Sequence, residues 1–291
     1  MPDKHEILPG DATPSGLSRR QFGAASAAVG VAAAATQAAA AGLPVSEKEV
    51  QIKTPDGTCD AFFAHPSTGQ HPGVLIWTDA FGLRPAFREM AKRLAAEGYA
   101  VLVPNPFYRL GTAPVVPAGI DFGKPDDRAK LMQIMGTVTA AGAAEQDAAA
   151  FVAFLDAQSQ VKKSAKIGTQ GYCMGGALTM RTAATNANRV GAGGSFHGGG
   201  LATDKPDSPH LLVPKIDANY LIAIADNDDK QDPAAKDTLR EAFKTAKKPA
   251  EIEVYSGANH GWCVPGSAVY NEPAAEKAWT RLLALYKTAL V

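Results

Sequence analysis

From residue 45 onward, the sequence alternates short apolar runs with amphipathic segments, and this alternation restricts the fold more than any other feature. The runs at 73–79 and 99–104 are apolar almost throughout, which is typical of strands that are covered on both faces. Residues 84–98 lie between them, place their apolar side chains on one helical face and end at Gly98. The alternation predicts an α/β fold with a mainly parallel central sheet and helices on both faces.

The remaining chain continues this pattern without a repeat or a linker long enough to separate domains. Two runs around the Asp56-Gly57 turn predict an opening hairpin. Further strands are expected at 165–173, 190–198, 219–229 and 250–261, and further helices at 143–158, 174–185, 232–248 and 272–290. A Pro- and Gly-rich loop from Asn105 to Asp126 is long for a compact domain, and loops of that length are often functional. We therefore expect one domain over residues 42–291.

The charge balance of the 291 residues limits the partners of the chain. Lys plus Arg and Asp plus Glu each total 29, so no net field favours a phosphate backbone, and we expect no nucleic-acid partner. The three cysteines, Cys59, Cys173 and Cys263, lack CxxC spacing and cannot all form disulfides within one chain. The His and Cys positions also lack the short paired spacings of a structural zinc site, so we expect no metal site and no cofactor.

The first 41 residues carry the order of a secretory signal. The segment SRRQFG at 18–23 precedes an uncharged Ala-rich run that ends in an Ala-x-Ala cleavage site at 39–41. The paired Arg19 and Arg20 resemble the twin-arginine export signal. A disordered tail or a membrane anchor is the alternative, but Ala is too weakly apolar for stable spanning. We expect residues 1–41 to be a twin-arginine-type signal peptide that is cleaved after export by the twin-arginine machinery, which leaves a periplasmic or secreted protein without a stable membrane span.

Residues 171–175, Gly-Tyr-Cys-Met-Gly, place Cys173 where a predicted strand runs into a predicted helix. This is the Gly-x-nucleophile-x-Gly elbow with Cys where Ser is usual, and its glycines permit a strained and crowded turn. The turn aims the thiol at a helix N-terminus, where the helix dipole and the Met174 backbone N–H stabilise a thiolate and later an oxyanion. A buried, inert cysteine is the alternative for any Cys. The position of Cys173 at the strand-to-helix junction favours a nucleophile.

A nucleophilic cysteine needs a base, and two of the six histidines are candidates. His260 follows the last predicted strand, where a loop can hold the imidazole over the elbow. His197 follows the strand after the nucleophile helix, so it either lines the pocket or caps a strand. We predict that His260 is the base.

The acid that orients the imidazole is expected in the segment ADNDD, which offers Asp226, Asp228 and Asp229 at the end of a predicted strand. Asp226 and Asp228 share one side of an extended chain, whereas Asp229 begins the turn. We predict Asp228 as the acid and keep Asp229 as the alternative. The resulting order of Cys, Asp and His is the order that an α/β-hydrolase requires.

The chain from residue 45 to the C-terminus resembles the dienelactone hydrolase family, the cysteine-dependent members of the α/β-hydrolase superfamily. The motifs that carry the resemblance are GYCMGG at the elbow, ADNDD, HGW, TDAFGL at 78–83 and PNPFYR at 104–109. The family's early strand ends in an acidic residue, which is Glu in the family and Asp79 here. Its dienelactone-cleaving members place a second Arg shortly after the histidine, where this chain has Cys263 and Val264.

The resemblance implies a triad of Cys173, Asp228 and His260 that hydrolyses lactones or carboxylic esters through an acyl-enzyme. It implies that the backbone N–H groups of Ala80 and Met174 form the oxyanion hole and that Asp79 modulates the thiol. It also implies that the substrate contacts Phe81, Tyr108, Arg109 and Trp262, with Arg109 binding an anionic group. The expected partner is therefore a small-molecule ester or lactone.

Two other functions stay open from the sequence. A cysteine peptidase would need an extended substrate groove, which no segment indicates. An exported thiol-redox or binding protein on a hydrolase scaffold would have Cys173 oxidised or paired with Cys263, and a fold alone does not decide function.

Overall fold

The computed structural model describes residues 42–291, and the expected signal peptide at 1–41 lies outside the described residues. Within 42–291, no helix combines the length and the apolar character that crossing a membrane requires. The residues from Leu43 to Val291 form one compact unit.

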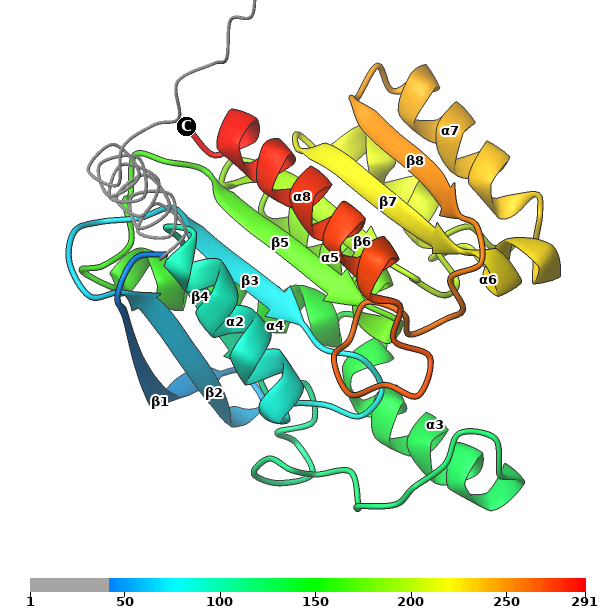
Figure 1. Cartoon of the computed structure of the whole chain (residues 1–291), viewed down its shortest axis with the longest axis horizontal. Helices are drawn as coiled ribbons and strands as arrows, with labels where there is room; N and C mark the ends of the chain where they lie inside the picture. The colour runs from blue at the N-terminus through cyan, green and yellow to red at the C-terminus, as the bar shows by residue number, and fades with distance from the viewer. Residues whose placement is uncertain (1–41) are drawn as a thin grey trace, which may run out of the picture. The chain divides into compact units, whose positions relative to one another are not determined.

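A central sheet of eight strands runs through this unit (Figure 1). The strands are β1 (Val45–Thr54), β2 (Gly57–Pro66), β3 (Gly73–Trp77), β4 (Ala100–Pro104), β5 (Ile167–Tyr172), β6 (Val190–Phe196), β7 (Asn219–Ala225) and β8 (Ala250–Tyr255). Their spatial order is β1-β2-β4-β3-β5-β6-β7-β8. The first two pairings in this order are antiparallel and the others are parallel. The predicted α/β fold with a mainly parallel sheet is confirmed, with the opening hairpin at one edge.

Helices cover both faces of this sheet. They are α2 (Pro85–Ala96), α3 (Pro125–Thr139), α4 (Ala143–Ala157), α5 (Met174–Thr185), the 3-10 helix η1 (Pro209–Lys215), α6 (Asp226–Gln231), α7 (Ala235–Thr245) and α8 (Glu272–Ala289). On one face, α2 and α8 share a hydrophobic cluster that includes Phe87 and Leu282. On the other face, α4, α5 and α7 supply Phe151, Leu178 and Phe243 to two further clusters.

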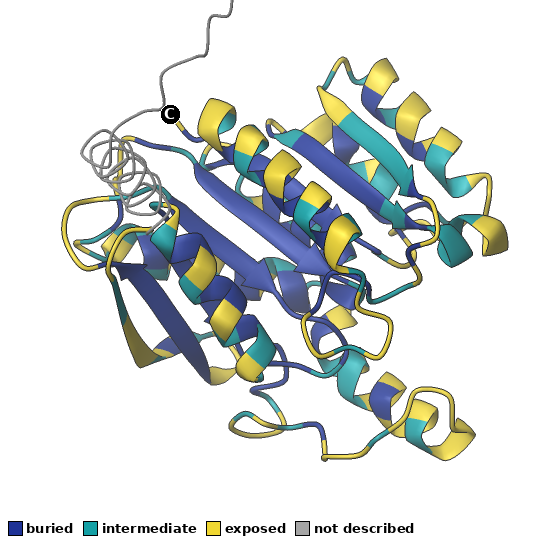
Figure 2. Ribbon diagram, viewed as in Figure 1, coloured by how far each residue is buried: buried dark blue, intermediate teal, exposed yellow. Residues whose placement is uncertain are grey.

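The hydrophobic pattern of each element explains how it is buried. The continuously apolar strands β3 and β4 are buried at every position, whereas β1, at the edge of the sheet, is largely exposed or half-buried. In α2 the buried side chains lie on one helical face, from Phe87 to Ala95. Figure 2 shows the same arrangement, with buried strands between helices whose outer sides are exposed.

Three helices differ from the sequence predictions. The helix α3 forms where the sequence predicts none. It left no sign in the sequence because only two of its side chains, Leu131 and Val138, are buried and its apolar face is weak. The strand expected at 219–229 ends at Ala225, and the acidic residues after it form α6. Acidic side chains in a first turn interact favourably with the helix dipole, which offsets the low helix propensity of Asp and Asn. The next helix, α7, accordingly begins at Ala235 rather than at 232.

Candidate active site

Cys173 lies in the tight turn between β5 and α5. Its backbone has φ 54° and ψ −116°, which is a strained conformation for a residue with a side chain. A Cβ at Gly175 would come within 2.6 Å of the carbonyl oxygens of Trp77 and Thr78, and a Cβ at Gly171 would collide with the Gly175 carbonyl. Both elbow glycines are therefore required, for the steric reason that the sequence predicted.

His260 and Asp228 meet at the edge of the sheet that carries this turn. His260 Nδ1 lies 2.6 Å from Asp228 Oδ2, and Cys173 and His260 line one cavity. The three residues follow β5, β7 and β8, whose parallel strands end at the same edge. The structure brings together the three side chains that the sequence predicted as a triad.

The environment of His260 favours its charged form. Burial of the imidazole opposes a positive charge, but the hydrogen bond to Asp228, the charge of its carboxylate and the neighbouring Cys173 outweigh burial and raise the pKa of His260 to about 10. This pKa favours the imidazolium at neutral pH, next to the Asp228 carboxylate.

Ion pairs distinguish the three acidic residues of ADNDD. Asp226 accepts a hydrogen bond from Lys230 at 2.8 Å, and Asp229 accepts one from Lys236 at 2.7 Å. Asp228 alone of the three bonds the imidazole of His260. All three lie in the helix α6, so the expected alternation of an extended chain does not separate them.

Asn227 is a site residue that the sequence did not indicate. Its Oδ1 accepts a hydrogen bond from the backbone N–H of His260 at 2.7 Å. The helix α6 therefore binds both the main chain and the imidazole of His260. An Asn after a strand is common in turns, and that local pattern carries no sign of the distant partner.

A cavity of about 540 Å³ opens over the elbow. Cys173, His197 and His260 line it together with the segment after β3, which contributes 79–81. The long loop from Asn105 to Asp126 contributes residues 120–122, and the loop after His260 contributes residues 264–268. Apolar side chains form much of the wall, namely Phe81, Ile120, Phe122, Val264 and Pro265. The long loop therefore takes part in the cavity that Cys173 and His260 line.

Asp79 forms an ion pair with Arg84 at the wall of this cavity. Arg84 Nη1 and Nη2 donate to Asp79 Oδ1 and Oδ2 at 2.6 and 2.7 Å, and the backbone N–H of Phe81 also donates to Oδ1, at 2.9 Å. No hydrogen bond joins Asp79 to Cys173 in the described part of the chain. Asp79 shares the cavity with the thiol, but its carboxylate is held by Arg84, a residue for which the sequence predicted no role.

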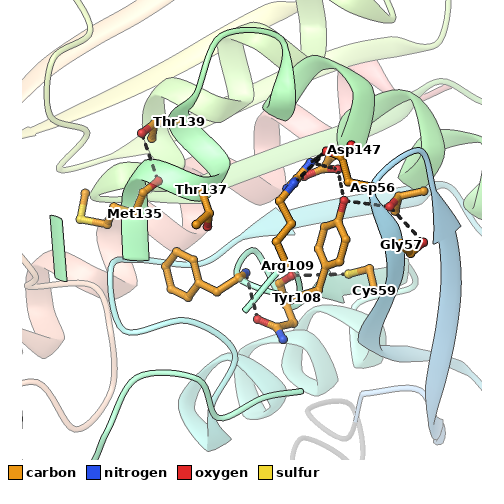
Figure 3. Close-up of polar contacts among 12 residues, drawn as sticks. Asp56, Gly57, Cys59, Tyr108, Arg109, Met135, Thr137, Thr139 and Asp147 are labelled. Carbon is orange, nitrogen blue, oxygen red and sulfur yellow. Dashed lines mark hydrogen bonds and ion pairs between the residues drawn. The ribbon is translucent and has the colours of Figure 1, made fainter. Parts of the chain in front are cut away.

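Tyr108 and Arg109 lie in a different network, which Figure 3 shows. Arg109 Nη1 and Nη2 donate to the two carboxylate oxygens of the fully buried Asp147 at 2.8 and 2.9 Å, and Arg109 also bonds Asp56. Tyr108 donates to Asp147 at 2.8 Å and accepts a hydrogen bond from Thr54 at 2.8 Å. Neither Tyr108 nor Arg109 lines the cavity, so their expected contacts with substrate have no support in this geometry. They anchor the start of the long loop to β1, the hairpin turn and α4.

The other predicted binding groups fall on both sides of the cavity wall. Ala80 and Phe81 line the cavity, and Met174 is the first residue of α5, so its backbone N–H lies at the helix N-terminus. Trp262 is fully buried behind the wall, stacked on Tyr255 with ring centroids 5.2 Å apart. We find Trp262 in the scaffold of the site rather than at its surface.

The three cysteines of the chain are all free thiols. Cys263 is buried in the cluster that contains α2 and α8, whereas Cys173 packs against the cluster on the opposite face of the sheet. The disulfide that a thiol-redox role would use is not formed. Within 42–291, no group of three or more His, Cys, Asp and Glu side chains is arranged to hold a metal ion.

Comparison with known proteins places this geometry in a family. The sequence profile of the dienelactone hydrolase family matches residues 59–290. A carboxymethylenebutenolidase of Rhodococcus opacus is 28% identical over 249 residues, which cover 82% of this chain and 90% of that protein. Among solved structures, a dienelactone hydrolase-like promiscuous phosphotriesterase from metagenomic libraries matches with a TM-score of 0.71 and 24% identity over 85% of this chain and all (100%) of the other. The dienelactone hydrolase of Anabaena variabilis shares the fold at a TM-score of 0.57 and 18% identity, over 85% of this chain and 99% of its own.

Proposed function

The chain belongs to the dienelactone hydrolase family and is a hydrolase, and we propose that it cleaves lactones or carboxylic esters through a triad of Cys173, His260 and Asp228. The observation that carries this proposal is that the strained elbow thiol and the His260 imidazole line one cavity and that the imidazole bonds the Asp228 carboxylate. An exported thiol-redox protein is not favoured, because Cys173 and Cys263 lie in different core clusters as free thiols.

In the proposed reaction, the sulfur of Cys173 attacks the carbonyl carbon of the substrate. The negative charge then develops on the carbonyl oxygen, where the backbone N–H groups of Ala80 and Met174 would stabilise it at the N-terminus of α5. The C–O bond to the alcohol breaks, the His260 imidazolium gives its proton to that oxygen, and an acyl-thioester remains on Cys173. Water adds to the thioester, a proton passes to His260, and the free acid leaves with the thiolate regenerated.

The pKa of His260 suits both halves of this reaction. The neighbouring Cys173 contributes to raising it. Acylation turns the thiol into a neutral thioester, so this contribution is lost and the pKa of His260 falls once the leaving group has taken its proton. The imidazole is then a base for water, while Asp228 keeps it in the required orientation.

The cavity favours a neutral substrate. Arg84 is the one arginine or lysine among its lining residues, and its guanidinium is bound by both oxygens of Asp79. Apart from this pair and His260, the charged side chain of the wall is Asp121, and the remaining wall is largely apolar. A substrate carboxylate would have to displace Asp79 from Arg84, so we propose neutral esters or lactones with an apolar acyl group as the preferred class.

We propose a periplasmic or secreted location for the mature chain. The support is the SRRQFG segment and the Ala-rich run at 1–41. Changing Arg19 and Arg20 together to Lys is expected to leave the full-length precursor in the cytoplasm, and mass spectrometry of the exported protein is expected to find an N-terminus near Gly42. An intact Met1 on exported, active protein would refute the cleavage.

The test of the proposed activity is a screen of lactones and aryl esters with the parent protein and two variants. Cys173→Ala is expected to abolish turnover while the thermal melting curve stays close to that of the parent, since one thiol in a turn contributes little to the core. Cys173→Ser keeps a nucleophilic oxygen and is the matched control. Turnover by Cys173→Ala on substrates that the parent cleaves would end the assignment.

A further inference from the structure

We propose that His197 is a positioning residue that holds the backbone of Cys173 through Nδ1 and presents an uncharged imidazole to His260. The inference rests on the proposed function, because it assigns His197 to the same nucleophile and base. The sequence left His197 as either a pocket residue or a strand cap.

The backbone fixes the His197 ring firmly. His197 directly follows β6 with φ 40°, a left-handed conformation that is rare for a residue with a side chain. Its N–H donates to the Ala223 carbonyl of β7 at 2.8 Å, and only 1% of the residue is exposed. An unusual backbone conformation kept at a buried position beside a reactive group is characteristic of functional sites.

The ring accepts a hydrogen bond from the nucleophile's own main chain. The N–H of Cys173 is shared between the Phe196 carbonyl at 3.1 Å and His197 Nδ1 at 3.2 Å. This bond acts on a residue whose φ of 54° is itself costly, so it helps to hold the turn that directs the thiol. Because Nδ1 accepts, it carries no proton, and the neutral ring must have its proton on Nε2.

The same ring packs against the proposed base. The His197 and His260 rings meet edge to face with centroids 4.8 Å apart, and Trp262 lies 5.2 Å from His197 on another side. Tyr172, at 6.0 Å, completes the aromatic surroundings, and Asp228 is bonded to His260 rather than to His197. A second positive charge at this distance would repel the His260 imidazolium, whereas a neutral ring supports it without that cost.

The surroundings keep His197 neutral. Burial lowers the pKa of His197 well below its ordinary value, and the charge of His260 lowers it further. Its Nε2 is buried without a hydrogen-bond partner among the described residues, which is an unfavourable arrangement for a histidine that only fills space. The Nδ1 contact to Cys173 and the contact with His260 account for a histidine at this position.

The experiment compares His197→Asn with His197→Gly, two residues that both tolerate a left-handed backbone. Asn offers Oδ1 near the place of Nδ1 and can still accept from Cys173, whereas Gly cannot. For a neutral aryl ester, His197→Gly is expected to lower kcat about tenfold or more with KM nearly unchanged, and His197→Asn is expected to recover most of that loss. The rate at which iodoacetamide alkylates Cys173 as a function of pH is expected to change in the Gly variant and to return toward the parent's profile in the Asn variant.

A folded His197→Gly variant with the parent's kcat, or an Asn variant as slow as the Gly variant, would overturn the inference. A measurement on the unchanged protein tests it independently of how the variants fold: nitrogen NMR of the histidine rings is expected to show His197 protonated at Nε2 only, from about pH 5 to about pH 9. A proton at Nδ1 in that range would refute it. Cys173→Ala separates the two claims, since residual turnover there refutes the proposed function, whereas failure of the His197 results alone leaves it standing.

Discussion

Two arginine–aspartate pairs of similar geometry have different positions in this protein. Arg84 and Asp79 form two hydrogen bonds at the wall of the cavity, where 27% and 10% of their side chains are exposed. Arg109 and Asp147 also form a two-bond pair, but Asp147 is fully buried and the pair lies away from the cavity. The first pair borders the reacting groups, and the second fastens a loop to the scaffold.

The difference shows that the partners of an arginine decide its role more than its place in a motif does. Arg109 stands where a family motif predicts an anion-binding residue, yet Asp56 and Asp147 occupy its guanidinium. Arg84 stands outside that motif and lines the cavity. We therefore expect changes at the cavity to alter catalysis and selectivity, and changes in the Arg109 network to alter stability.

The largest effect is expected beside the cavity, from Asp228, the proposed acid of the triad. Asp228→Asn should lower kcat by about 10⁴-fold, by analogy with other triad acids, because the amide no longer holds the imidazole in the required tautomer. The melting temperature should fall modestly at neutral pH, because Asp228 raises the pKa of His260 and so contributes to stability there. Asp229→Asn is the matched control one position away, where the partner is Lys236. A normal rate for Asp228→Asn with an inactive Asp229→Asn would reassign the acid.

The second effect concerns the scaffold pair. Arg109→Ala leaves the Asp147 carboxylate buried without its charge partner, which typically costs about 3–5 kcal/mol in the free energy of unfolding. Urea denaturation measures this loss, and Arg84→Ala serves as the comparison, with a smaller loss expected at its more exposed site. If Arg109→Ala kept the parent's stability and instead raised KM for acidic substrates alone, Arg109 would belong to the substrate site after all.

The third prediction sharpens the role of the cavity pair. Asp79→Asn frees Arg84 to bind a carboxylate, and a charge-assisted hydrogen bond is worth about 1.5–3 kcal/mol. The ratio of kcat/KM for an acidic lactone to that for a neutral ester should therefore rise by about 10- to 100-fold. The double variant Asp79→Asn with Arg84→Gln should return the ratio toward the parent's value. An unchanged ratio in the single variant would mean that the pair does not set the charge preference.

The fourth prediction concerns the pH dependence of stability at the cavity. Because folding raises the pKa of His260 from about 6.5 to about 10, its charged form stabilises the folded state fully below about pH 6.5, and this contribution is lost as the pH rises through about 10. The difference in unfolding free energy between the parent and His260→Gln should shrink over that interval. A difference that stays constant or grows with pH would contradict the charged state assigned to His260.

Much of the fold follows from local sequence patterns, since apolar runs such as those of β3 and β4 report two-sided burial directly. The elbow was also predictable. Crowding requires glycine at positions 171 and 175, and these two glycines form a recognisable motif around the cysteine. The helix α3 escaped prediction because it has few buried side chains.

Side-chain contacts that a sequence motif does not show account for the residue roles that were not predicted correctly at the site. The pair of Asp79 with Arg84 is local, but nothing in its spacing shows that the carboxylate turns toward the arginine instead of the thiol. The partners of Arg109 come from 38 and 53 residues away, and the partner of Asn227 from 33. Only the folded chain brings these groups together, so a motif read along the sequence cannot assign them.

The central claim is that Cys173 carries the acyl group during turnover. Intact-protein mass spectrometry after rapid acid quench of the reaction with a neutral aryl ester tests it most directly. The account predicts a mass increase of one acyl group per chain, located by peptide mapping on the peptide that contains Cys173 and absent from Cys173→Ala. An acyl group on any other residue, or continued turnover by Cys173→Ala without any adduct, would contradict the account.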